Sequence, residues 1–90
     1  MRKIKMHVYG RVQGVGFRFI TMMLAKELNV VGSVENLDDG SVYIEAVADK
    51  DAMAAFITRI ENSPGPSSHV EKVVIENVDT LEDFNKFRIL

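Results

Sequence analysis

The sequence predicts an α+β fold with the element order βαββαβ and a short extra strand near residue 90. Two periodicities lead to this prediction. In four segments apolar residues alternate with polar ones, as in half-buried strands, and in two segments between them apolar residues recur every three or four positions, as in amphipathic helices. Each predicted strand has one apolar side, so both helices are expected to cover the same face of one sheet.

The first strand and the first helix are predicted at residues 3–9 and 17–28. In "KIKMHVY" apolar and polar side chains alternate strictly, which is typical of a strand with one buried face. From Phe17 onward the apolar residues follow the helical period instead. Asn29 is a suitable residue to end this helix, because asparagine enters the left-handed region more readily than most residues.

The second half of the chain repeats this pattern. Strands at 33–37 and 41–48 flank "DDGS", and the Asp39-Gly40 pair is a strong hairpin signal. A helix is predicted at 50–61, a loop at the proline-containing "NSPGPSS", a strand at 69–78 and an edge strand within "FNKFRIL". The order corresponds to a ferredoxin-like βαββαβ sandwich, an antiparallel sheet with two helices on one face.

Composition limits the classes of protein to which the chain can belong. Its 90 residues, 47% hydrophobic and 27% charged, are those of one soluble domain spanning 1–90. There is no cysteine, hence no disulfide or thiolate site, and no apolar run of about 20 residues that could cross a membrane. We therefore expect a cytoplasmic protein. The pI of about 5.6 argues against general nucleic-acid binding, although residues 1–26 contain no acidic residue and could attract a small anion.

The glycine-rich stretch "GRVQGVGFR" at residues 10–18 is the first candidate for function. It lies between the first strand and the first helix, where glycines let successive main-chain N–H groups converge on an anion at the positive end of the helix. Arg18 adds a planar set of donors that matches phosphate oxygens. The spacing of Gly10, Gly14 and Gly16 fits neither a Walker A loop nor a dinucleotide fingerprint, so a plain tight turn stays possible on these grounds.

Asn36 is the second candidate. In the predicted topology the second strand runs parallel to the first with the third strand between them, so its end emerges at the same sheet edge as the glycine stretch, roughly 10 Å away. Asn36 shares its parity with Val34 and is expected to face the helices. The alternative is an ordinary strand-end asparagine that hydrogen-bonds the adjacent turn.

These residues resemble the signature of the acylphosphatase family. The likeness covers "GRVQGVGFR" at 10–18, "GSVENLDDGSV" at 32–42, "GPSSHVEKV" at 65–73 and the closing "FRI", and so almost the whole chain. The resemblance implies a ferredoxin-like fold and hydrolysis of acyl phosphates to carboxylate and phosphate. It implies that Arg18 binds the phosphate, that Asn36 orients the attacking water, and that the main-chain N–H groups of Gln13, Gly14, Val15, Gly16 and Phe17 cradle the phosphate.

The resemblance also sets expectations about binding partners, and two residues of this chain depart from the family pattern. We expect a monomer that acts on a small acyl phosphate without metal ion or cofactor and binds neither nucleic acid nor membrane. Ser33 stands where the family usually has an aromatic residue, and Glu35 where a basic or neutral one is frequent. By strand parity both point away from Asn36, so neither is expected to abolish the chemistry.

Other readings of the same residues remain. A non-catalytic anion-binding or regulatory module on this fold is the main alternative, because the fold hosts many functions. An RNA-recognition module is a third, but Tyr9 and Tyr43 are its only outward aromatic candidates.

Several polar residues have ordinary explanations. His7 and His69 stand alone, and Asp38 and Asp39 flank a hairpin glycine. Arg11 precedes the glycine loop and could guide anions, but is expected to be a solvated loop charge. For Thr21, a hydrogen bond that braces the loop and a plain position on the helix face are both possible.

Overall fold

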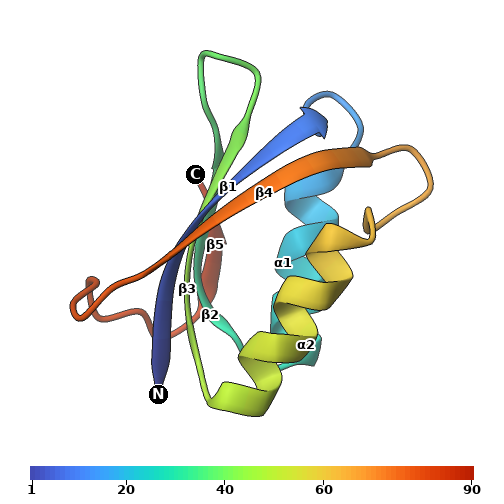
Figure 1. The fold of residues 1–90 in the computed structure, drawn as a ribbon. Helices are drawn as coiled ribbons and strands as arrows, with labels where there is room; N and C mark the ends of the chain where they lie inside the picture. Colours follow the sequence, from blue (N-terminus) through green and yellow to red (C-terminus); the bar gives the residue numbers. More distant parts are fainter.

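The computed structural model describes residues 1–90 and consists of one sheet with two helices on one of its faces (Figure 1). Neither helix is long and apolar enough to span a membrane. The strand order in the sheet is β4-β1-β3-β2-β5. The elements are β1 (Arg2–Arg11), α1 (Phe17–Glu27), β2 (Val31–Asn36), β3 (Val42–Ala48), α2 (Lys50–Glu61), β4 (His69–Asn77) and β5 (Phe87–Ile89).

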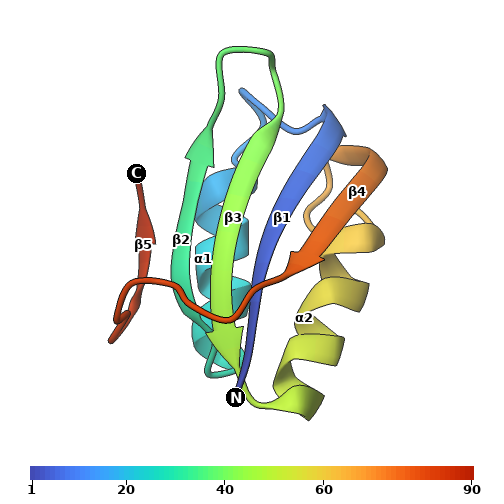
Figure 2. The same cartoon turned by 60° about the vertical axis from the view of Figure 1, so that its left-hand side comes forward.

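The sheet topology brings the ends of β1 and β2 to one edge. Both strands pair antiparallel with β3, so they run in the same direction, and the β1–α1 loop and the β2–β3 hairpin lie at the same end of the sheet (Figure 2). The predicted ferredoxin-like fold is therefore confirmed. One feature differs: β5 pairs parallel with β2, which makes the five-stranded sheet mixed, because the chain after β4 crosses the other strands before it reaches β2.

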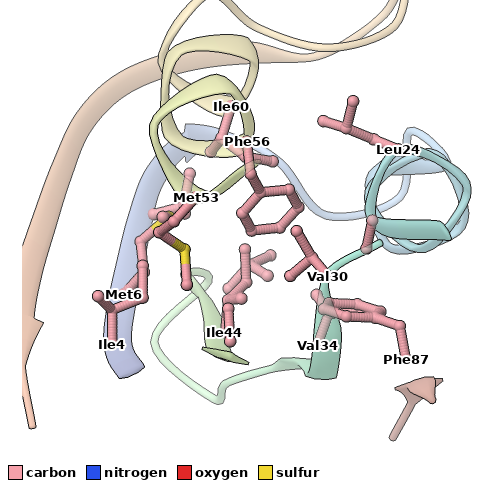
Figure 3. Close-up of a cluster of buried hydrophobic side chains, with 14 of the residues drawn as sticks. Ile4, Met6, Leu24, Val30, Val34, Ile44, Met53, Phe56, Ile60 and Phe87 are labelled. Atoms are coloured by element: carbon pink, nitrogen blue, oxygen red, sulfur yellow. The ribbon is translucent and has the colours of Figure 1, made fainter. Parts of the chain in front are cut away.

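The core lies between the helices and the sheet. Seventeen apolar side chains are buried there, including Ile4 and Met6 from β1 and Met53 and Phe56 from α2 (Figure 3). Phe87 of β5 joins them and meets Phe56 edge to face, with ring centroids 6.1 Å apart. Because burial of each large side chain contributes about 1.5–3 kcal/mol, this layer holds the strand ends in fixed positions.

The predicted element bounds agree with the structure to within two residues. The end of β1, predicted at residue 9, is one of the two-residue differences. This strand continues through Gly10 and Arg11, which pair with β4 across a bulge between Tyr9 and Gly10. Gly10 has φ 128°, and a Cβ there would overlap the carbonyl oxygen of His69. Gly10 is thus a strand glycine required by close backbone approach, not part of the loop.

The predicted stops and turns are present. Asn29 has φ 60°, as expected for the residue that ends α1. In the hairpin, Asp39 accepts hydrogen bonds from the main-chain N–H and the hydroxyl of Ser41, and Gly40 has φ 90°. Asp39 is therefore explained by turn chemistry, while the side chain of Asp38 makes no hydrogen bond in the turn.

Candidate active site

The loop between β1 and α1 opens the positive end of a helix to solvent. Gly14 and Gly16 adopt left-handed conformations with φ 74° and 77°, and Gly16 is the N-cap of α1. No side chain caps the helix, and its first turn contains no acidic residue. The partial positive charge of the helix N-terminus is therefore available to a ligand.

The main-chain donors of this loop are free. None of the main-chain N–H groups of residues 13–19 donates a hydrogen bond to an acceptor within the protein. Alternating left-handed glycines curve such a segment so that successive N–H groups converge, which forms a concavity for an anion. The segment from Gln13 to Phe17 thus combines two left-handed glycines with free main-chain donors.

Arg18 is held at the mouth of this loop by the far end of the chain. Its Nη1 donates a hydrogen bond of 3.1 Å to the main-chain oxygen of Leu90. The N–H of Leu90 in turn donates to the carbonyl oxygen of Val34 in β2, at 2.9 Å. Arg18 has further N–H groups on its guanidinium, so it can contact an anion while it keeps this anchor.

Asn36 ends β2 on the side that faces the helices. Its Oδ1 is buried and has no hydrogen-bond partner within the protein. The alternative that Asn36 serves the adjacent turn is therefore wrong for this oxygen, because Asp39 fills that role. A buried amide oxygen without a partner costs free energy unless a ligand or water donates to it.

Gln13 connects the glycine loop to the hairpin beyond Asn36. Its side-chain Nε2 donates hydrogen bonds of 2.8 Å to the carbonyl oxygens of Leu37 and Ser41. Both N–H bonds of the amide are thus used, which fixes the loop relative to the strand end. The sequence predicts only a main-chain role for Gln13. Its side-chain hydrogen bonds depend on the geometry of the hairpin, which strand periodicity does not reveal.

Five of the seven predicted site residues meet around one cavity of about 190 Å³. Gly14, Gly16, Phe17, Arg18 and Asn36 all line it, and Arg18 is the only charged residue that does. Of the other predicted residues, Gln13 turns its side chain to the hairpin and Val15 packs against the core.

Three lining residues were not predicted. Val12, Phe19 and Ile89, together with Phe17, supply the apolar part of the cavity wall. The position of Phe19 directly after Arg18 was a signal available in the sequence. Ile89 gave no such signal, because its place depends on the parallel pairing of β5 with β2.

The remaining polar candidates lie away from the cavity. Arg11 is exposed at the end of β1, not in a loop, and His69 is exposed at the start of β4. Thr21 is fully buried, and its Oγ1 has no hydrogen-bond partner, so it does not brace the loop through a hydrogen bond. No three His, Cys, Asp or Glu side chains lie close enough together to hold a metal ion.

The face of the sheet opposite the helices carries a cluster of three ring side chains, His7, Tyr9 and Tyr43. His7 packs against Tyr43, with ring centroids 4.9 Å apart, and lies near Tyr9. Burial and the hydrogen bond that Tyr43 donates to Glu45 raise the pKa of this phenol above its ordinary value of 10.0. Ser33 and Glu35 pair with Glu45 and Tyr43 on this same face, away from Asn36.

Comparisons with known proteins agree with the geometry. Residues 4–89 match the family model Acylphosphatase. An acylphosphatase from Enterococcus faecalis is 49% identical over 90 residues, which cover 100% of this chain and 99% of that protein. Among solved structures, an acylphosphatase from Bacillus subtilis superposes with a TM-score of 0.94 at 36% identity, covering 100% of this chain and 99% of that one. An acylphosphatase from Coxiella burnetii superposes with a TM-score of 0.91 at 32% identity, covering 99% of this chain and 92% of that one.

Proposed function

This chain belongs to the acylphosphatase family and is an enzyme that hydrolyses acyl phosphates, and from that premise we propose which residues carry the reaction. Arg18 and the main-chain N–H groups of residues 13–17 bind the phosphate. Asn36 orients the attacking water. The observation that supports this assignment best is that one cavity is lined by Arg18, by Asn36 with its unpartnered Oδ1, and by three loop residues with free N–H groups.

The phosphate site combines three sources of positive potential. These are the free loop N–H groups, the N-terminal end of α1 and the Arg18 guanidinium, and Gly14, Gly16, Phe17 and Arg18 line the cavity. They are fixed before substrate arrives, because Gln13 holds the loop and Leu90 holds Arg18. Donors that need no rearrangement stabilise the charge that develops on the equatorial phosphate oxygens.

Asn36 supplies the acceptor that a nucleophilic water needs. A water that donates one hydrogen bond to Asn36 Oδ1 is directed by the strand end toward a phosphate in the loop. The lone pair of its oxygen is then free to attack phosphorus, so the amide acts by positioning.

The reaction itself requires little further help. The water oxygen forms a bond to phosphorus, the bond between phosphorus and the acyl oxygen breaks, and the carboxylate leaves with that electron pair. One water proton passes to a phosphate oxygen. A carboxylate is a weak base and leaves readily, and a loose phosphoryl transition state depends mainly on positioning and charge stabilisation. All the proposed residues come from one chain, so the site needs no second copy.

The direct test is hydrolysis of benzoyl phosphate in the presence of EDTA. Arg18→Gln is expected to lower kcat/KM about a thousandfold, and Asn36→Ala about a hundredfold, with unchanged circular dichroism spectra. Arg11→Gln is the matched control, since Arg11 is exposed and does not line the cavity. Wild-type activity in both variants would overturn the residue assignments. Thermal stabilisation by phosphate without any turnover would indicate a non-catalytic anion-binding module instead.

A further inference from the structure

Exposed apolar side chains gather beside the phosphate site. Two of the molecule's exposed large apolar residues, Phe19 at 57% and Ile89 at 39% exposure, line the cavity itself, and Leu90 follows at 54%. Isolated exposed apolar residues are ordinary, but two on the wall of one cavity form an apolar surface that a ligand can cover. The full set is Met1, Phe19, Met23, Val74, Ile89 and Leu90.

The fold places Phe19 and Ile89 on the same side as Asn36. Phe17 is buried at the start of α1, and two residues correspond to about 200° around a helix, so Phe19 lies away from the core. Ile89 pairs with Val34 and therefore shares the sheet face of Val34 and Asn36. Helix and edge strand thus each contribute one exposed apolar residue to the wall of the cavity, beside the buried Phe17.

An acyl phosphate has two parts with different chemistry. Its phosphate matches the donors of the loop and Arg18, while its acyl group needs a surface of its own. We propose that the acyl group lies against Phe19 and Ile89, so that the enzyme prefers acyl phosphates whose acyl group is apolar, aromatic ones above all. This inference rests on the proposed function, because it assumes the phosphate in the loop.

The composition of the wall also argues against charged acyl groups. Arg18 is the only charged residue that lines the cavity, and it serves the phosphate. A second carboxylate or an amine on the acyl group would lose water without gaining a partner, which is unfavourable. An aromatic ring, in contrast, can pack on the side chain of Phe19 and removes apolar surface of both groups from water.

The test compares kcat/KM for benzoyl phosphate and acetyl phosphate. In Phe19→Gln the benzoyl-to-acetyl ratio is expected to fall about tenfold, because kcat/KM for benzoyl phosphate falls more than kcat/KM for acetyl phosphate. Ile89→Thr is expected to lower the ratio in the same direction. Met23→Gln is the matched control: Met23 is 51% exposed on the same helix but does not line the cavity, so the ratio should not change.

The outcomes separate this inference from the proposed function. If the wild-type protein hydrolyses neither substrate, the proposed function fails. If both are hydrolysed and the ratio is unchanged in Phe19→Gln and Ile89→Thr, only the acyl-group surface is wrong. The thermal shift caused by inorganic phosphate should stay at the wild-type value in Phe19→Gln. Equal loss of both activities together with loss of that shift would show that Phe19 supports the phosphate loop, and would also overturn the inference.

Discussion

The side-chain amide of Gln13 donates a hydrogen bond of 2.8 Å to the carbonyl oxygen of Leu37, the residue that follows Asn36. The second hydrogen of the same amide goes to Ser41, on the other side of the hairpin. One side chain therefore sets the position of the glycine loop relative to the strand end. In the proposed mechanism the glycine loop holds the phosphate and the strand end holds the water, so Gln13 also sets the distance between these two reactants.

Gln13→Ala is expected to lower kcat/KM about tenfold to a hundredfold, because small displacements of positioned groups have effects of this size. The two lost hydrogen bonds should also lower the free energy of unfolding by about 1–3 kcal/mol. Gln13→Glu has nearly the same shape but cannot donate when ionised, so it should show the same loss of activity. Steady-state kinetics and urea unfolding measure both effects. Wild-type kcat/KM in the two variants would mean that the loop keeps its position without this contact.

Thr21→Val is expected to stabilise the protein. Thr21 is fully buried and its hydroxyl has no partner, so a methyl group of similar size removes an unsatisfied polar atom. The free energy of unfolding should rise by about 1 kcal/mol, which corresponds to an increase in Tm of roughly 4–8 °C for a domain of this size. Scanning calorimetry is the measurement, and kcat/KM should not change. A lower Tm would show that the hydroxyl has a partner in solution.

Two glycine-to-alanine substitutions should differ sharply in effect. A Cβ on Gly32 would overlap the carbonyl oxygen of Glu45 in the neighbouring strand, so Gly32→Ala should destabilise by about 3 kcal/mol or more. Gly14 has open space around it, so alanine there adds only the strain of a positive φ. Gly14→Ala should therefore lower the free energy of unfolding by about 1–2 kcal/mol. Urea unfolding curves give both values, and equal losses would contradict this assignment of causes.

The hairpin beside Asn36 should show a pH dependence. The side-chain hydrogen bond from Ser41, supported by the Ser41 main-chain N–H, lowers the pKa of Asp39 below its ordinary value of 3.8. A lowered pKa in the folded state means that the stabilisation is present above about pH 3.8 and is lost as the pH falls through the folded-state value. Asp39→Ala should therefore have a lower Tm than wild type at pH 7, and the difference should shrink below pH 3.8. Asp38→Ala, which removes no side-chain hydrogen bond, is the control and should keep the wild-type Tm at both pH values. If the Tm difference between Asp39→Ala and wild type stays the same at low pH, the prediction is wrong.

The periodicity of the chain was sufficient to predict the order of the elements and the face covered by the helices. The same reasoning, with the topology, brought Arg18 and Asn36 to one edge, where both line the cavity. The parallel pairing of β5 could not be predicted, because three residues with one buried side chain carry no information on strand direction. The contacts of Arg18 with Leu90 and of Gln13 with Leu37 depend on that pairing and on the hairpin geometry, so they also required the structure.

The parallel edge strand has a consequence for how activity is lost on heating. β5 has three residues and pairs with a single neighbour, so its local opening requires less free energy than global unfolding. Opening of β5 releases the Leu90 oxygen that holds Arg18, while the other four strands and both helices keep their places in the fold. Thermal inactivation is therefore expected to begin below the Tm measured by circular dichroism, with the amides of residues 87–90 exchanging hydrogen early. Inactivation and unfolding at the same temperature would mean that the edge opens only with the whole fold.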